Sequence, residues 1–226
     1  MLDRRTLIVG LPLVCAGGVR FARGAEPFTL WGPPAAPSII LAQAVATGVP
    51  KAIAPDGTVF KVWRTPDEMR AGLSSNTMEA VVVPSYVAAN LYNRGLGVQL
   101  LNILTDGLLY VVAAPGVVST IAGLRGKRVA VPFRNDMPDF ILKRLLATAG
   151  LTAGDLTIDY SGSPPEAVQM LLAGRVDAAL LSEPTSSAAI VRAKAAGKPL
   201  ERAVDCQQAW AGGSGRATIP QAGLAV

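Results

Sequence analysis

Of the residue types that many enzymes use for catalysis, histidine is absent from this chain and cysteine is rare. Its 226 residues contain no histidine, so neither a histidine-based triad nor a histidine metal site can be built. Cys15 lies in an apolar N-terminal run, and Cys206 has no evident base near it in the sequence. The glycines of Gly212–Gly215 form neither a phosphate-binding nor a dinucleotide fingerprint. The sequence therefore predicts no catalytic residue, no metal site and no cofactor.

Polar and aromatic side chains instead gather in loops that follow predicted strands. The carboxyl ends of strands in open α/β sheets are where ligands bind, so these loops are expected to form a cleft. Several of them precede helices, whose free N–H groups favour an anionic ligand, whereas a carboxylate in the same place favours a cation or a hydrogen-bond donor. The candidate ligand-binding residues are Trp31, Pro37, Ser38, Ser85, Tyr86, Phe133, Arg134, Asn135, Asp136, Ser163, Glu183 and Pro184.

Each of the main candidates also has a purely structural interpretation. Ser38, Ser85 and Thr185 are equally well explained as helix N-caps. Tyr86 can be a surface or core aromatic, and Arg134 a solvated loop charge. Because the candidates carry charges of both signs, the sequence leaves the charge of the ligand open.

The N-terminus has the order of features of an export signal. Arg4 and Arg5 precede an apolar run at 7–16, and small residues follow at Ala22, Gly24 and Ala25. We therefore expect residues 1–25 to be a signal peptide. The paired arginines resemble a twin-arginine signal, with general secretion as the alternative.

Charge and composition describe a globular exported domain. Half of the residues are apolar and 16% are charged, with a net charge of +5. Residues 1–25 carry a net +3, which leaves +2 for the rest and gives no reason to expect nucleic acid or an anionic membrane as partner. We expect a monomer that is not an integral membrane protein.

Short apolar runs alternate with amphipathic segments after Pro27, which is typical of α/β layers. The predicted strands are 28–31, 59–63, 80–83, 99–104, 108–113, 128–131, 156–160, 178–181 and 219–226. The predicted helices among them are 38–46, 85–94, 136–149, 164–173 and 185–196.

One pattern occurs twice and organises the rest of the chain. Thr65-Pro-Asp-Glu68 and Ser163-Pro-Pro-Glu166 both open a helix with a capping box and a proline in the first turn. In both copies a strand and a further helix follow, and a strand–loop–helix unit precedes. Each half therefore reads β-α-β-α-β, which predicts two related lobes. We expect lobe one at 26–115 plus 207–226 and lobe two at 116–206, joined by a hinge of two crossings.

Several segments resemble a family of periplasmic binding proteins for nitrate, sulfonates, taurine and thiamine precursors. The helix-to-strand stretch 172–184 (LAGRVDAALLSEP) is the most specific, supported by 124–131 (LRGKRVAV) and 32–38 (GPPAAPS). The resemblance implies a type II periplasmic-binding fold that delivers a small molecule to the permease and ATPase of an ABC transporter. Family members continue beyond the return strand, so the C-terminal part is expected to be truncated.

The resulting interpretation is an extracytoplasmic or periplasmic solute-binding protein rather than an enzyme. Two alternatives remain open. One is an enzyme on the same fold that acts on a pyrimidine or a menaquinone-type precursor, and the other is a ligand-sensing domain of a regulator.

Overall fold

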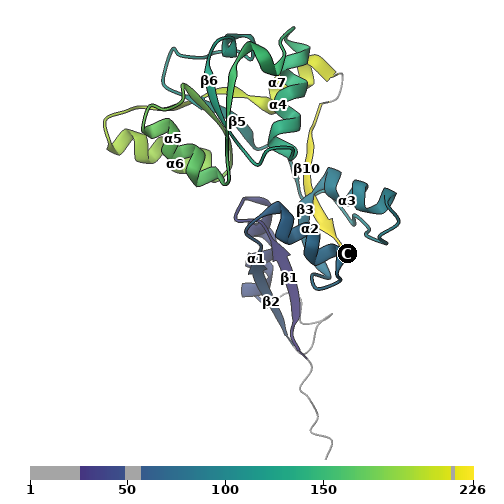
Figure 1. Cartoon of the computed structure of the whole chain (residues 1–226). Helices are drawn as coiled ribbons and strands as arrows, with labels where there is room; N and C mark the ends of the chain where they lie inside the picture. The colour runs from purple at the N-terminus through teal and green to yellow at the C-terminus, as the bar shows by residue number, and fades with distance from the viewer. Residues whose placement is uncertain (1–25, 49–56, 215–216) are drawn as a thin grey trace, which may run out of the picture.

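The chain folds into two α/β lobes, one above the other in Figure 1. The computed structural model describes residues 26–48, 57–214 and 217–226. Each lobe has a five-stranded mixed sheet of its own, in the order β2-β1-β3-β10-β4 for lobe one and β7-β6-β8-β5-β9 for lobe two. The two-lobed α/β fold expected from the sequence is therefore confirmed.

Lobe one contains β1 (Phe28–Gly32), α1 (Pro37–Ala46), β2 (Thr58–Val62), α2 (Pro66–Ser74), β3 (Ala80–Pro84), α3 (Ser85–Asn93), β4 (Thr105–Asp106) and the returning β10 (Pro220–Ala225). Lobe two contains β5 (Leu109–Ala113), β6 (Arg128–Pro132), α4 (Met137–Thr148), β7 (Thr157–Ser161), α5 (Pro164–Leu172), β8 (Ala178–Ser182), α6 (Thr185–Ala195), β9 (Glu201–Asp205) and α7 (Cys206–Ser214). Two short 3-10 turns, η2 (Ala122–Leu124) and η3 (Ala153–Asp155), also belong to lobe two.

The internal repeat is visible in the strand pairing. In lobe one β1 lies parallel between β2 and β3, and in lobe two β6 lies parallel between β7 and β8. The fourth strand of each sheet is antiparallel and arrives from the other lobe, as β10 in lobe one and β5 in lobe two. The two lobes therefore share one topology.

The repeated capping boxes form in both lobes in the same way. The Thr65 hydroxyl accepts a hydrogen bond from the Glu68 amide at 3.2 Å, and the Ser163 hydroxyl accepts one from the Glu166 amide at 3.4 Å. Each glutamate reaches back to the amide one residue before the cap, that of Arg64 at 2.7 Å and that of Gly162 at 2.8 Å. Local chemistry thus fixes the starts of α2 and α5.

The expected lobe boundaries are corrected at both crossings. The strand β5 was expected in lobe one, but it pairs with β8 and β9, so lobe two begins before Leu109. Helix α7 packs on α4, so the return to lobe one lies between Ser214 and Pro220 rather than near 205–208. The stretch 99–104 follows β10 through backbone bonds but forms only an isolated bridge, and β9 and α7 were not predicted.

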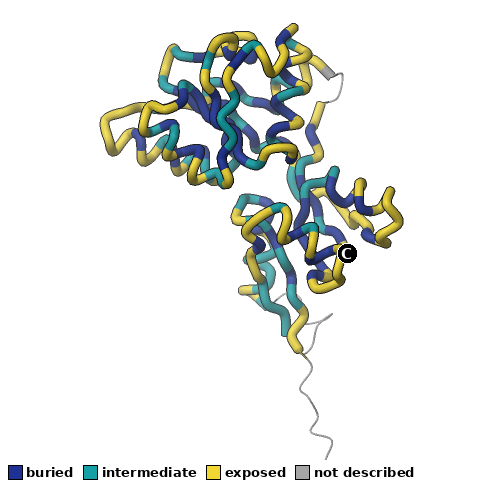
Figure 2. Tube along the Cα trace, viewed as in Figure 1, coloured by how far each residue is buried: buried dark blue, intermediate teal, exposed yellow. Residues whose placement is uncertain are grey.

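The two lobes bury their sheets to different extents. In lobe two, alternate residues of β6 and β8 face α4 and α7 on one side and α5 and α6 on the other, so both faces of the sheet are covered. In lobe one the main core lies between the sheet and helices α2 and α3. Helix α1 leaves Ile39 and Ile40 more than half exposed, and Figure 2 shows β1 and β2 only partly buried.

No helix among the described residues has the length and apolar character needed to cross a membrane.

Candidate functional site

A cavity of about 100 Å³ lies where the loops of the two lobes meet. Its wall is largely apolar and includes five prolines: Pro33, Pro37, Pro66 and Pro84 from lobe one, and Pro138 from lobe two. Trp63 and Phe133 add aromatic surface from opposite lobes. The cavity is thus bounded by the last residues of β3 and by the segments that follow β1, β2, β6 and β8, as expected for the carboxyl ends of the strands.

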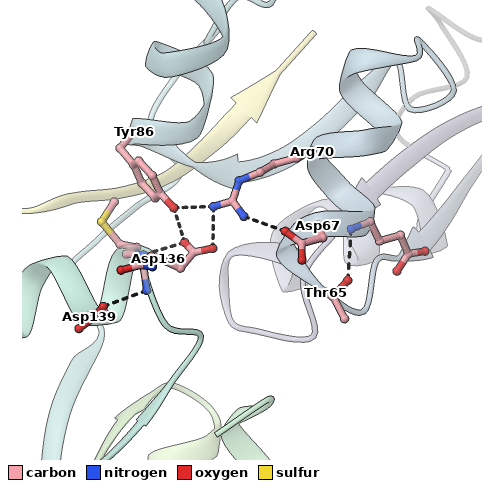
Figure 3. A network of polar contacts seen from close by, with 9 residues as sticks. Thr65, Asp67, Arg70, Tyr86, Asp136 and Asp139 are labelled. Atoms are coloured by element: carbon pink, nitrogen blue, oxygen red, sulfur yellow. Dashed lines mark hydrogen bonds and ion pairs between the residues drawn. The ribbon is translucent and has the colours of Figure 1, made fainter. Parts of the chain in front are cut away.

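Three residues join the lobes beside this cavity, and they form the interlobe network drawn in Figure 3. Asp136, the N-cap of α4, accepts a hydrogen bond from the Arg70 guanidinium at 2.9 Å and from the Tyr86 hydroxyl at 2.7 Å. Arg70 also donates to the Tyr86 oxygen at 2.7 Å. The carboxylate is 3% exposed and accepts a further bond from the Met137 amide at 2.6 Å. Two side chains of lobe one thus hold a buried carboxylate of lobe two.

The protonation states of Tyr86 and Arg70 follow from these contacts. Burial and the neighbouring Asp136 carboxylate raise the pKa of the Tyr86 hydroxyl, which therefore stays a neutral donor. Partial burial lowers the pKa of Arg70, but the charge of Asp136 and the hydrogen bonds to Asp136 and Tyr86 outweigh this and leave the pKa raised. The Arg70 guanidinium therefore stays charged where it faces Asp136.

Two further contacts join the lobes. The Ala36 amide of lobe one donates to the Glu183 carbonyl of lobe two at 3.2 Å. The rings of Tyr86 and Phe140 meet edge to face at 5.3 Å. These contacts hold the loop after β1 and helix α3 against lobe two.

Asp139 holds the loop that presents Asp136. Its wholly buried carboxylate accepts from the Asn135 amide at 2.9 Å, from Lys143 at 2.8 Å and from the Tyr160 hydroxyl at 3.0 Å. The loop needs this support because Phe133 and Asn135 have φ of 61° and 58°, a region that non-glycine residues rarely adopt.

The twelve candidates predicted from the sequence do not all reach the cavity. Those that line it are Pro37, Phe133, Asp136 and Glu183. Tyr86 lies next to it through Asp136, and the Asn135 backbone is held by Asp139. The other six do not line it.

Those six have structural contacts of their own. Ser38 and Ser85 donate to the carbonyls of Pro33 and Pro220, each at 2.5 Å. Ser163 caps α5, and Pro184 is the N-cap residue of α6. The remaining two carry cation–π contacts: Lys61 lies over Trp31, and Arg134 over Tyr160.

The alternative interpretation of three residues as N-caps is also corrected. The N-cap positions of α1, α3 and α6 are taken by Ala36, Pro84 and Pro184, none of which makes a side-chain cap. Ser38, Ser85 and Thr185 therefore lie inside their helices. Among the candidates that precede a helix, Asp136 does act as an N-cap, because its carboxylate accepts a hydrogen bond from the Met137 amide of α4.

The sequence did not predict three residues of this region: Arg70 of the interlobe network, and Trp63 and Gln221 of the cavity wall. A signal for Arg70 was available in the internal repeat. When Thr65 is aligned with Ser163, Arg70 falls opposite Val168, which is buried in lobe two. A charged residue at a position where the other copy buries an apolar one indicates that its side chain makes polar contacts. Trp63 and Gln221 carry no comparable signal.

Cys206 is unsuited to nucleophilic chemistry. The residue is wholly buried, and burial raises the pKa of its thiol to about 12. The reactive thiolate is therefore absent at neutral pH.

The two-lobed arrangement is similar to that of solved structures of periplasmic and ABC-type binding proteins. The structure is similar to the periplasmic aliphatic sulphonate binding protein SsuA from Escherichia coli, with a TM-score of 0.66 and 16% identity over 89% of this chain and 65% of that one. It is also similar to an ABC transporter structure from Parabacteroides distasonis, with a TM-score of 0.65 and 24% identity over 88% of this chain and 65% of that one. A ligand-binding component of an ABC-type import system from Staphylococcus aureus, solved with zinc bound, gives a TM-score of 0.69 and 10% identity over 89% and 66% of the two chains.

The sequence itself identifies the family. Residues 67–212 match the NMT1-like family, and the chain belongs to it. This agrees with the family expected from the sequence. A search of curated proteins found no match. The chain spans about 65% of the length of the first two structures named above.

Proposed function

We propose that this protein is an extracytoplasmic solute-binding protein, which captures a small molecule in the interlobe cavity and delivers it to the permease and ATPase of an ABC importer. In this proposal residues 1–25 direct export, and the protein releases its ligand chemically unchanged. The proposal rests above all on one observation: a single cavity is walled by residues of both lobes, Trp63 and Pro84 on one side and Phe133 and Glu183 on the other.

Such a cavity couples binding to closure. A ligand can favour the closed arrangement only if it interacts differently with the closed and open forms. A ligand between Trp63 and Phe133 does so, because these residues belong to different lobes. The lobes are connected by two chain crossings, which permits them to move as units.

The test begins with protein purified from its native host. Native mass spectrometry should find a co-purifying small molecule, and the released molecule should have the same mass before and after incubation with the protein. N-terminal sequencing should start near residues 24–27. A chemically altered ligand would favour an enzyme, and a cytoplasmic protein that begins at Met1 would contradict export.

Filling the cavity tests its location. Ala35 lines the cavity, so Ala35→Phe should abolish binding of the co-purified molecule and the compaction seen by small-angle scattering on its addition. Ala89→Phe places the same ring at an exposed position of α3 and should bind as the parent does. If the two variants bind equally, the ligand site lies elsewhere.

A further inference from the structure

The two chain crossings between the lobes lie next to each other, at the waist through which β10 passes in Figure 1. On the lobe-one side of this waist, Asp106 pairs with Pro220 in the sheet. On the lobe-two side, the Gly107 amide donates a hydrogen bond to the Ile219 carbonyl at 3.0 Å. One crossing therefore changes lobe between Asp106 and Gly107, and the other between Ile219 and Pro220.

The contacts of the neighbouring residues agree with this division. The Ile219 side chain is 3% exposed and belongs to the core of lobe two. The Leu108 carbonyl accepts a hydrogen bond from the Glu183 amide at 3.1 Å, so Leu108 is also held by lobe two. The Pro220 carbonyl instead accepts a hydrogen bond from the Ser85 hydroxyl, at the start of α3 in lobe one. The change of lobe is thus confined to two neighbouring backbone links.

The side chain of Gln207 fastens the second crossing to lobe two. Gln207 lies in the first turn of α7, and its Oε1 atom accepts a hydrogen bond from the Ile219 amide at 3.0 Å. Its Nε2 atom donates to the Ala217 carbonyl at 3.3 Å. The backbone amide of Gln207 is itself held by the Asp205 carboxylate at 2.8 Å. The crossing therefore follows lobe two up to the last residue before β10.

The two crossings differ in how far their backbones can turn. The ring of Pro220 fixes its φ, and a residue that precedes a proline, here Ile219, is restricted to extended conformations. The second crossing is therefore stiff. Gly107 has a φ of 68°, and a glycine can take up large changes of φ and ψ. The first crossing must therefore absorb most of any rotation of the lobes.

Gln207 also contacts the first crossing. A Cβ atom at Gly107 would lie 2.9 Å from the Gln207 Oε1 atom and 3.1 Å from its Cδ atom, so a larger residue there would have to displace this side chain. The next residue, Leu108, lines the interlobe cavity. One side chain of α7 therefore touches both crossings, directly beside the cavity.

We infer that Gln207 is the positioning residue of the hinge: it holds the second crossing on lobe two, so that the lobes turn at the Ile219–Pro220 link while Gly107 absorbs the change. This inference goes beyond the proposed function, because it concerns how the lobes move and not what they bind. Without the two hydrogen bonds of Gln207 the rotation would spread over residues 217–219, and the lobes would sample a wider range of relative positions.

The Gln207→Met variant tests this role in the full chain. Methionine has a similar length and volume, so the packing of α7 and the contact with Gly107 are kept, whereas both hydrogen bonds to the crossing are lost. Gln208→Met is the control, since Gln208 is the next residue of the same helix and is exposed. Hydrogen exchange of the Ile219 amide should be about fivefold faster in Gln207→Met, the ordinary effect of one hydrogen bond, and unchanged in the control.

The range of lobe positions is measured by double electron–electron resonance between spin labels. The labels are placed on exposed residues of each lobe, as Asn90→Cys and Gln169→Cys. Cys15→Ser and the complete burial of Cys206 confine labelling to these two positions. The distribution of interlobe distances should be wider in Gln207→Met than in the parent or in Gln208→Met. The widening should be greater when Asp136→Asn is added, because the interlobe network then restrains the lobes less.

A second pair of variants tests the first crossing. Gly107 and Gly97 have φ of 68° and 66°, so alanine meets the same unfavourable backbone conformation at both positions. A Cβ atom at Gly97 has no atom within 4 Å, whereas one at Gly107 meets Gln207. Gly107→Ala should therefore shift the mean interlobe distance, and Gly97→Ala should leave it as in the parent.

The outcomes separate this inference from the proposed function, because all of these measurements use the protein without ligand. Faster exchange at Ile219 with an unchanged distance distribution in Gln207→Met would overturn the inference, since Gln207 would then hold only its own segment. Equal distances in Gly107→Ala and Gly97→Ala would overturn the role of the first crossing. Either result leaves the proposed function standing if the co-purified molecule still closes the lobes. If Gln207→Met widens the distribution but no co-purified molecule closes the lobes, the inference stands and the proposed function is wrong.

Discussion

Removing one hydroxyl group should loosen the association of the lobes. Tyr86→Phe deletes the donor that reaches Asp136 at 2.7 Å and leaves the ring, with its edge-to-face contact to Phe140, in place. Because Tyr86 belongs to lobe one and Asp136 to lobe two, this bond exists only while the lobes are together. The substitution therefore changes the free-energy difference between closed and open forms and has little effect within either lobe.

The size of the effect follows from what Asp136 keeps. A hydrogen bond to a charged group contributes about 1.5–3 kcal/mol. The lower end applies, since the carboxylate still accepts from Arg70 and from the Met137 amide and so is not left unpaired. A loss of about 1.5 kcal/mol corresponds to about a tenfold shift of the equilibrium toward the open form. Asp136→Asn also removes the ion pair with Arg70, and it should shift the equilibrium further.

Small-angle scattering measures this equilibrium through the radius of gyration. The radius should increase in Tyr86→Phe and more in Asp136→Asn, and the affinity for a ligand that requires closure should fall in the same order. Tyr92→Phe is the control, because Tyr92 lies on the same helix but is 64% exposed. If all three variants scatter and bind as the parent does, the interlobe network does not hold the lobes together.

Three further perturbations have defined outcomes. Burial raises the pKa of Glu183, but hydrogen bonds from Ser186, Ser187 and Arg202 outweigh it and hold this pKa below the usual 4.5. The ionised Glu183 side chain therefore stabilises the fold fully above about pH 4.5, and this stabilisation is lost as the pH falls through the folded-state pKa. In urea titrations Glu183→Gln should be less stable than the parent by about 1–2 kcal/mol at pH 7, and the difference should disappear in acid. Asp139→Asn should lower the free energy of unfolding by about 2–3 kcal/mol and broaden the amide resonances of 133–136, whereas the exposed Asp106→Asn should do neither. Ile40→Lys should raise solubility, measured as the protein left in solution after concentration. It should change the free energy of unfolding by no more than about 0.5 kcal/mol, because the Ile40 side chain is largely exposed. A loss of several kcal/mol would mean that α1 buries this residue.

Local patterns predicted most of the fold. The capping boxes at Thr65 and Ser163 act within four residues, so the starts of α2 and α5 could be read directly. The strands β3 and β8 are buried along nearly their whole length and appear as continuous apolar runs. By contrast β9 (ERAVD) has charges at three of its five positions, since it lies at a sheet edge with two exposed residues, and it shows no such run.

The site depended on contacts that no local pattern contains. Arg70 and Asp136 are 66 residues apart and meet only after both lobes have formed. Gln221 reaches the cavity because β10 returns from lobe two to pair with β3. Arg134 was expected to bind ligand, but its loop, bent by left-handed residues on either side, places the guanidinium over Tyr160. Sequence patterns predicted several of the loops that border the cavity and could not assign the partners within them.

The unequal covering of the two sheets has a consequence for how the molecule opens. The sheet of lobe two has helices on both faces, whereas β2 of lobe one has no fully buried residue. Segments with few buried apolar contacts open locally at a lower free energy than the global transition. Amide protons of β1 and β2 should therefore exchange with solvent deuterium well before those of β6 and β8. Lobe one would then behave as a separate, weaker cooperative unit, and a single transition midpoint would not describe the stability of the whole chain.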